Sequence, residues 1–339
     1  MIDPQPLRRT ASFPLQGIPM TEHIWTIGID IGATKIEVAG VDDSGTVLHS
    51  IRRETPANSG ARELETGIAG MVHEISGSIG SRPRAAGVGM AGQIDPQNGS
   101  VVFSPNLGWH NVPLQEMLAS TLGIPVAVTN DVRAAAWGEW QFGAGRGCSD
   151  LVCVFVGTGI GGGIVSRGQM LTGCSNTAGE IGHLVIDLNG PVCTCRNHGC
   201  LEAMAGGWAI ARDAQQAAAR DPGAGAGLLR LAQGNISAIT AQTVSGAAHS
   251  GDALALEIVR KTAEALIAGA VSLVHAFNPC KLILGGGVVE GMPELVSMVD
   301  TGIRDRALGS ALTNLSVVQS RLHGHAGVVG AAAYAAAHR

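Results

Sequence analysis

The sequence is poor in features that several large classes of protein require. Of its 339 residues, 3% are aromatic and 14% are charged, and the net charge is −5 with no long run of lysine and arginine. A nucleic-acid surface needs a basic footprint, so this balance argues against one. The most apolar window, 263–277, is shorter than the ~18–20 residues that span a bilayer, and it contains Glu264 and His275. We therefore expect neither a nucleic-acid partner nor a membrane partner.

An export signal and a disulfide framework are also missing. Residues 1–23 contain prolines and arginines but no apolar core of a signal peptide, and we expect them to form a flexible N-terminal extension. The cysteine count is seven, an odd number, which favours free thiols in a reducing cytoplasm. What the chain does have is 45% hydrophobic residues and 49 glycines. A chain of this length and apolar content can bury the cores of two domains.

Strands, glycine loops and helices alternate in an order that occurs twice. Thr26–Ile31 and Glu37–Val41 are β-rich and enclose a glycine loop, and Leu151–Val156 and Ile164–Val165 repeat this arrangement later in the chain. Helical spacing is found at 62–79, 114–122, 134–141, 203–219, 252–277 and 327–338. The repeated order of strand, loop, strand and turn predicts two similar α/β units.

Three glycine loops each follow an apolar β segment directly, which is typical of phosphate binding. They are Asp30–Lys35, Gly157–Gly163 and Gly285–Gly287. Glycine lets backbone N–H groups approach phosphate oxygens because no Cβ stands in the way. The polar groups available beside these loops are the Thr34 and Thr158 hydroxyls, the Lys35 cation and the Asp30 carboxylate. A carboxylate at a strand end suits a hydrated Mg²⁺, which binds through one or two carboxylates and phosphates.

The GxGxxG match within Gly157–Gly163 is by itself a weak signal. A dinucleotide site requires a helix after the glycines, whereas this segment continues with β-branched residues and breaks at Arg167-Gly168. The Walker A pattern is absent, since no Gly-Lys-Ser/Thr follows the first glycine at the required distance. The pattern therefore predicts a β-hairpin, and a plain tight turn is the structural alternative to phosphate binding.

Asn130-Asp131 stands where a strand is expected to turn into a helix. Both residue types are common helix N-caps, and position alone favours that role. The functional alternative is a carboxylate that accepts a proton from a hydroxyl during group transfer. A helix N-terminus stabilises the ionised form of such a group, which suits a base.

One imidazole and three thiols lie close together in the sequence, at His183, Cys193, Cys195 and Cys200. This set suits a four-coordinate, closed and therefore structural zinc site. The spacing matches neither the paired CxxC of zinc ribbons nor the CxxC of redox proteins. Crowded unpaired thiols are the alternative, and His198 is a rival ligand. The other cysteines, Cys148, Cys153, Cys174 and Cys280, are expected to be core or incidental thiols.

Five segments together resemble the ROK family of repressors, open reading frames and kinases, within the actin/sugar-kinase/Hsp70 superfamily. They are GIDIGATKIEVAGVD, TNDVRAAAWGE, GTGIGGGIV, AGEIGH and CTCRNHGCLE, in the family's order. The resemblance implies a two-domain actin-like ATPase (ribonuclease H-like) α/β fold, with duplicated units and an interdomain cleft. We expect an N-terminal domain at 24–130, joined by the C-terminal helix 327–339. A C-terminal domain at 131–326 would carry a zinc loop at 183–200.

The resemblance also implies an ATP-dependent, Mg²⁺-requiring sugar kinase with structural Zn²⁺, most similar to bacterial glucokinases that phosphorylate the 6-hydroxyl of glucose. Asp131 would be the catalytic base and His183, Cys193, Cys195 and Cys200 the zinc ligands. The implied sugar-binding residues are Gly92, Asn106, Asn130, Asp131, Glu180, His183 and Glu202. The implied cofactor-binding residues are Asp30, Gly32, Thr34, Lys35, Gly157, Thr158, Gly159, Gly285, Gly286 and Gly287. A homodimer is implied as well.

The sequence departs from the family pattern at two places and leaves alternatives open. Arg196 stands where the family usually has glycine. If the backbone there has a positive φ, an arginine costs about 1 kcal/mol or more relative to glycine. Met90-Ala91-Gly92-Gln93 replaces a common Pro-Gly. The substrate could instead be N-acetylmannosamine, N-acetylglucosamine, mannose or fructose, and the donor could be polyphosphate. A sugar sensor without activity and a ROK repressor are the non-enzyme alternatives. The short, proline-containing segment before the first strand is unlike the repressors' helix-turn-helix.

Overall fold

The computed structural model describes residues 24–32, 34–56 and 60–338, so the expected N-terminal extension at 1–23 lies outside the described residues. These residues divide into two compact units. Unit 1 comprises 24–134 together with 327–338, and unit 2 comprises 135–326.

Unit 1 is built on a five-stranded mixed sheet with the order β3-β2-β1-β4-β8. Its strands are β1 (Trp25–Ile31), β2 (Lys35–Asp42), β3 (Val47–Glu54), β4 (Ala86–Met90) and β8 (Val126–Asn130). β1, β2 and β3 pair antiparallel, whereas β4 and β8 extend the sheet parallel to β1. A small three-stranded sheet, which the sequence did not predict, contains β5 (Gln93–Ile94), β6 (Val101–Ser104) and β7 (Trp109–Val112). Strands of two to four residues are too short for a periodic pattern to show.

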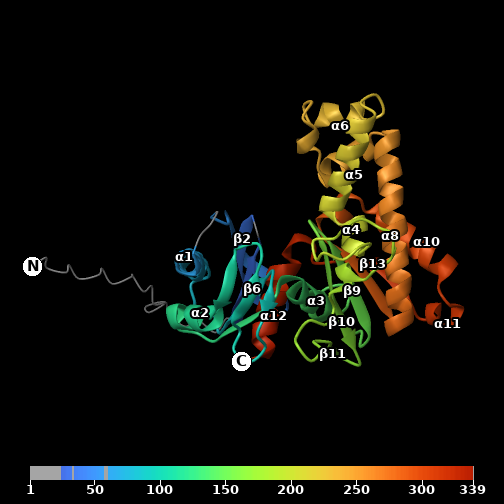
Figure 1. The fold of residues 1–339 in the computed structure, drawn as a ribbon. Helices are drawn as coiled ribbons and strands as arrows, with labels where there is room; N and C mark the ends of the chain where they lie inside the picture. The colour runs from blue at the N-terminus through green and yellow to red at the C-terminus, as the bar shows by residue number, and fades with distance from the viewer. Residues whose placement is uncertain (1–23, 33, 57–59, 339) are drawn as a thin grey trace, which may run out of the picture. The chain divides into compact units, whose positions relative to one another are not determined.

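Helices cover both faces of this sheet because residues alternate in direction along β1. Ile27, Ile29 and Ile31 belong to a core shared with α1 (Ala61–Ile79) and α2 (Leu114–Leu122). On the other face, a Cβ at Gly28 would lie 1.8 Å from the Val328 carbonyl oxygen of α12 (Ala326–Ala337). Glycine at this position therefore lets α12 lie directly against the strand, as Figure 1 shows for the red C-terminal helix.

Unit 2 repeats the sheet of unit 1 in strand order and in direction. Its order is β11-β10-β9-β12-β13, with β9, β10 and β11 antiparallel and β12 and β13 parallel to β9. The bounds are β9 (Leu151–Val156), β10 (Ile160–Ser166), β11 (Gln169–Met170), β12 (Lys281–Gly285) and β13 (Ser316–Gln319). The duplication that the sequence predicted is confirmed, and the segment after Gly157 is a hairpin strand as expected.

A large helical layer packs on one face of this second sheet around the long helix α8 (Ala253–Phe277) (Figure 1). Asp252 caps α8 by accepting the Ala255 N–H, and Asn278 ends it at φ +44°. The other helices are α4 (Leu201–Ala205), α5 (Gly207–Arg220), α6 (Ala226–Leu231), α7 (Ala241–His249), α9 (Gly287–Gly291), α10 (Glu294–Arg306) and α11 (Gly309–Leu312). Short 3₁₀ turns are η1 (Ile181–His183), η2 (Ile236–Ala238) and η3 (His323–His325). Gly206 is extended and separates α4 from α5, so the helical segment expected at 203–219 consists of two helices.

Helix α3 (Asp131–Gln141) begins three residues before the expected start at Ala134. The earlier start follows from Asn130, whose Oδ1 accepts the backbone N–H groups of Val132 and Arg133, each at 3.1 Å. The division between the two units falls within this helix, after Ala134.

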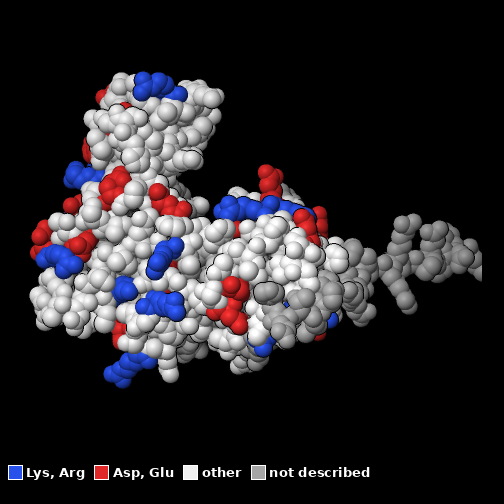
Figure 2. Space-filling model, turned by 180° about the vertical axis from the view of Figure 1, so that it is seen from behind, with Lys and Arg blue, Asp and Glu red and all other residues white. Residues whose placement is uncertain are grey.

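Positive charge is not segregated on the face of the molecule that Figure 2 shows. In Figure 2, the Lys and Arg side chains on the face shown are interspersed with Asp and Glu side chains. Among the helices of the described residues, none is both long enough and apolar enough to cross a bilayer.

Candidate active site

The carboxyl ends of three neighbouring parallel strands bring the candidate sugar residues of unit 1 to one edge of its sheet. Asp30 of β1 is level with Gly89 of β4, and Met90 of β4 is level with Asn130 of β8. A Cβ at Gly89 would come within 3.3 Å of the Asp131 Cα, so this glycine leaves room for the first turn of α3. Asp30, Asn130 and Asp131, which are far apart in sequence, are therefore neighbours at this edge.

Asn130 caps helix α3, and Asp131 places its carboxylate at the same helix end. The Asn130 Oδ1 caps α3, which leaves its amide Nδ2 as the end that could donate to a ligand. The Asp131 Oδ1 accepts the Val132 N–H at 2.9 Å, which orients the carboxylate at the helix N-terminus. Capping by one residue and presentation of a carboxylate by the next are thus compatible.

Asp30 lies in an environment that disfavours its charge. Burial, with smaller contributions from the nearby Asp131 and Glu37 carboxylates, raises the pKa of the Asp30 carboxyl to about 7 against opposite effects of Lys35 and Arg52. A divalent cation would offset the repulsion between these carboxylates, and carboxylate oxygens are ligands that Mg²⁺ accepts. The donor set therefore fits a magnesium ion bound at Asp30.

We expect Asp30→Asn to stabilise the metal-free and nucleotide-free protein at alkaline pH. The folded pKa of about 7 exceeds the ordinary aspartate pKa of 3.8, so between these pH values the folded state holds a proton that the unfolded chain has lost. The wild-type free energy of unfolding therefore falls as pH rises from about 4 to about 7 and stays low above that. Asparagine removes this loss, so the Tm difference between variant and wild type should grow over that window and reach several degrees at pH 8. A Tm difference that is independent of pH would contradict the assignment.

The loop between β1 and β2 is a hairpin turn, as the sequence predicted. The Gly32 N–H donates to the Lys35 carbonyl at 2.9 Å, and Thr55 supports the turn by donating to the Gly32 and Thr34 carbonyls. The Thr34 and Lys35 side chains are exposed. Ala33 lies outside the described residues.

Gly92 and Asn106 lie in a bend and a turn next to strands of the small sheet that the sequence did not predict. Gly92 has φ +148°, and a Cβ there would lie 2.5 Å from the Phe103 carbonyl oxygen, so only glycine fits without a shift. Asn106 is exposed in the turn between β6 and β7.

In unit 2, the glycine hairpin and the third glycine turn lie side by side. β12 pairs with β9 so that Gly285 is level with Phe155, and Gly286, at φ +87°, packs against the Val156 backbone. The Gly157 carbonyl accepts the Gly207 N–H at the start of α5. A Cβ at Gly157 would meet no atom of the described residues within 4 Å, so the space beside it is open to a ligand.

Glu202 has structural partners that its predicted sugar-binding role did not include. Its Oε2 accepts the Ile160 N–H at 3.0 Å, and its Oε1 accepts the Thr194 hydroxyl at 3.1 Å and the Trp208 indole N–H at 3.4 Å. A Cβ at Gly159 would lie 2.2 Å from Oε2, so that glycine makes room for the carboxylate. Glu202 thus joins the cysteine loop to the glycine hairpin. Thr194 stands between two predicted zinc ligands, but no pattern in the sequence indicates its hydroxyl bond.

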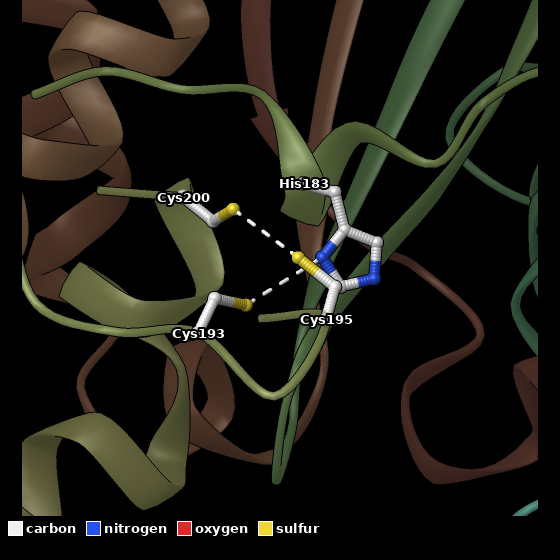
Figure 3. A group of neighbouring side chains, drawn as sticks. All are labelled: His183, Cys193, Cys195 and Cys200. Carbon is white, nitrogen blue, oxygen red and sulfur yellow. Dashed lines mark hydrogen bonds between the residues drawn. The ribbon is translucent and has the colours of Figure 1, made fainter. Parts of the chain in front are cut away.

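The four predicted zinc ligands converge in unit 2. The ligand atoms of His183, Cys193, Cys195 and Cys200 all lie within 4.8 Å of one another, and Figure 3 shows the three sulfurs turned toward one edge of the imidazole. The Cys195 and Cys200 sulfurs are 3.6 Å apart, and the His183 Nδ1 is 3.7 Å from the Cys193 sulfur. Zn–S bonds of about 2.3 Å in a tetrahedron place sulfurs about 3.8 Å apart. The cluster therefore fits a zinc ion. His198, the rival ligand, is not part of it.

The pKa values of the Cys195 and Cys200 thiols are shifted in opposite directions. Burial, together with hydrogen bonds and charge from Cys195 and Cys193, raises the pKa of the Cys200 thiol to about 12. The Asn197 backbone N–H lowers the pKa of the Cys195 thiol. Three neighbouring thiolates need a cation to neutralise them, which is what a bound zinc ion would supply.

Glu180 directly precedes the 3₁₀ turn η1, and His183 is the last residue of that turn. Glu180 is exposed, and its carbonyl accepts the His183 N–H at 3.1 Å. The His183 Nδ1 faces the sulfurs, and the other ring nitrogen points away from them (Figure 3). A metal-bound histidine commonly donates its second N–H to another group, so this nitrogen could meet a sugar hydroxyl.

Arg196 has φ +74° in the cysteine loop, the conformation that makes glycine the usual residue. We expect Arg196→Gly to raise the free energy of unfolding by about 0.5–1 kcal/mol, since relief of the left-handed strain exceeds the entropy that glycine adds to the unfolded chain. Urea unfolding of the zinc-loaded protein measures this. Equal or lower stability of the variant would show that the loop carries no strain at this position.

The two repeated sheets, each with a glycine turn in its hairpin, define a class: α/β proteins of the actin-like ATPase fold. The ROK family profile matches residues 26–338, and the chain belongs to the ROK family. The glucokinase of Thermotoga maritima is 37% identical over 90% of this chain and 95% of its own length.

A solved glucokinase structure and a transcriptional regulator are also similar to this chain over most of its length. The ROK family glucokinase from Streptomyces griseus in complex with glucose and AMPPNP is 36% identical, with a TM-score of 0.82 over 92% of this chain and 99% of that chain. The DNA-binding transcriptional dual regulator NagC of Escherichia coli is 30% identical over 92% of this chain and 75% of its own length.

Proposed function

We propose that the protein is an ATP-dependent sugar kinase that transfers the γ-phosphoryl group of ATP to the 6-hydroxyl of glucose. The observation that carries the proposal is the placement of Asp131 at the first turn of α3 beside Asp30, in a chain similar to glucokinases over most of its length. An alcohol is a poor nucleophile, so a base that accepts its proton contributes roughly 10²–10⁴-fold to the rate. Asp131 is that base in this proposal.

The remaining residues of unit 1 bind and orient the acceptor and the metal. The Asn130 Nδ2, the Asn106 side chain and the Gly92 N–H donate to sugar hydroxyls. Asp30 holds a hydrated magnesium ion, which neutralises phosphate charge when it is bound. The repulsion that raises the Asp30 pKa supports this role, because a cation would relieve it.

The residues of unit 2 bind phosphates and the other sugar hydroxyls. The open space at Gly157 and the exposed Thr158 hydroxyl suit phosphate oxygens, and the turn Gly285–Gly287 borders the same sheet edge. Sugar hydroxyls form hydrogen bonds with Glu180, Glu202 and the second ring nitrogen of His183. Zinc at His183 and the three cysteines is structural: it fixes His183 and, through Thr194, the Glu202 carboxylate.

A coupled ADP-release assay over glucose, mannose, fructose, N-acetylglucosamine and N-acetylmannosamine tests the acceptor. We expect glucose to give the highest kcat/KM, and ATP to outperform polyphosphate when each is supplied with Mg²⁺. An N-acetylhexosamine with a higher kcat/KM would replace glucose as the substrate. The sugar-responsive regulators of the family share this fold, so the absence of turnover with every sugar, together with retained sugar binding, would favour a sensor.

We also propose an oligomeric state and a cellular compartment for the enzyme. We propose a homodimer, as the family resemblance implies, and light scattering should then give twice the mass of one chain. The seven cysteines are free thiols, the state that a reducing cytoplasm maintains, and we place the enzyme there. A monomeric mass across micromolar concentrations would remove the dimer from the proposal and leave the chemistry unaffected.

A further inference from the structure

We propose that Glu139 is a positioning residue that clamps α3 to the segment beside the third glycine turn. Glu139 is eight residues after Asp131 on the same helix and is fully buried, at 0% exposure. Its Oε1 accepts three hydrogen bonds, from the Ser320 hydroxyl at 2.7 Å, the Arg321 N–H at 2.9 Å and the Leu322 N–H at 2.7 Å. Its Oε2 accepts the Ala144 N–H at 2.7 Å.

Glu139 and its partners Ser320–Leu322 lie close to the two places where the chain passes from one unit to the other. The chain passes between the two units twice, within α3 after Ala134 and again after Ala326. Glu139 lies just after the first passage, and Ser320–Leu322 lies just before the second. One buried carboxylate therefore ties together, within unit 2, the two segments that lead into the connections between the units.

The same clamp reaches the end of strand β12. The Ser320 N–H donates to the Leu284 carbonyl at 2.7 Å, and a Cβ at Gly285 would lie 2.7 Å from the Ser320 Cβ. The neighbouring chain is fitted around the carboxylate too, because a Cβ at Gly143 would lie 2.1 Å from its Oε2. Glu139 thus links the helix that presents Asp131 to the turn that begins at Gly285.

The chemistry of the site requires a carboxylate. Four donors point at two acceptor oxygens, and an amide of the same shape would turn its NH₂ group toward at least one of them. Glu139→Gln therefore leaves a buried N–H or O–H group without its acceptor. The helix should lose its fixed position without losing its fold, and a displacement of about 1 Å at a reacting group can cost on the order of 10²-fold in rate.

The expected effect of Glu139 on turnover rests on the proposed kinase function. The experiment therefore measures kcat and, independently of that function, the hydrogen exchange of the backbone around Ser320. For Glu139→Gln, we expect kcat for glucose phosphorylation to fall about 10–100-fold at an unchanged KM for glucose. Backbone amide hydrogen exchange in the peptide spanning 319–323 should accelerate. Ser320→Ala, which removes one of the four donors, should give smaller changes in the same direction.

Val299→Ala is the matched control, because Val299 is a fully buried core residue of unit 2 on α10. It should lower Tm while leaving kcat and the exchange of 319–323 as in the wild type. Unchanged exchange in Glu139→Gln would overturn the clamp. An equal kcat loss in Val299→Ala at equal Tm loss would reduce Glu139 to a purely structural role. A wild type without kinase activity would refute the proposed function, and the exchange readout would still decide whether the clamp exists.

Discussion

Asp131→Asn is expected to lower kcat for glucose phosphorylation by roughly 10²–10⁴-fold while the dissociation constant for glucose changes little. Asparagine keeps the size of the side chain and an oxygen that can accept the Val132 N–H, which Asp131 accepts at 2.9 Å. The variant loses the ability to take up the proton of the sugar hydroxyl, and it also loses the negative charge that helps to raise the Asp30 pKa. Steady-state kinetics with ATP, paired with calorimetric titration of glucose, separates these effects.

Asp43→Asn provides the control for this substitution. Asp43 is an exposed aspartate in the turn after β2, within the same unit, so its replacement should leave both kcat and glucose binding unchanged. If Asp131→Asn retained more than about a tenth of the wild-type kcat, the assignment of Asp131 as base would be wrong. If it lost glucose binding in proportion to activity, Asp131 would be a binding residue instead.

Removal of zinc is expected to weaken sugar binding and folding together. The cluster fixes His183 directly and Glu202 through Thr194, and Glu202 in turn holds the Ile160 N–H of the glycine hairpin at 3.0 Å. Metal analysis should find about one zinc ion per chain. Chelation should lower Tm and raise the KM for glucose by more than about tenfold, because free energy of zinc binding is also free energy of folding.

Two cysteine variants separate this effect from general loss of a thiol. Cys200→Ser removes a buried ligand and should reproduce the chelated state, with less than one zinc ion per chain. Cys174→Ser changes an exposed cysteine outside the cluster and should retain zinc, Tm and KM. A fully active preparation that contains no zinc would show that the four residues do not form a metal site.

The sequence predicted the repeated architecture well because strong local signals mark it. The strand Leu151–Val156 is a continuous apolar run, and the structure has it with these bounds. The cysteine cluster was also predictable, since its ligands lie close together in the chain. The start of α3 was misplaced by three residues because the Asn130 cap outweighs the apolar pattern that begins at Ala134.

What the sequence could not show depends on contacts between distant segments. The raised pKa of Asp30 comes mainly from burial, and the Asp131 carboxylate, about a hundred residues away in the sequence, adds to it. The Glu202 bond to Ile160 and the four bonds to Glu139 arise in the same way, from tertiary packing. A glutamate in a sequence is most often a solvated surface residue, so neither role has a local signal.

The most direct test of the kinase assignment is identification of the product formed from ATP, Mg²⁺ and isotopically labelled glucose. Phosphorus-proton correlation NMR of the reaction mixture assigns the phosphorylated hydroxyl, while a parallel assay counts ADP. We expect glucose 6-phosphate in a one-to-one ratio with ADP, and no product with Asp131→Asn on the same timescale. ADP release without a sugar phosphate, or phosphate on any hydroxyl other than the 6-hydroxyl, would contradict the kinase assignment.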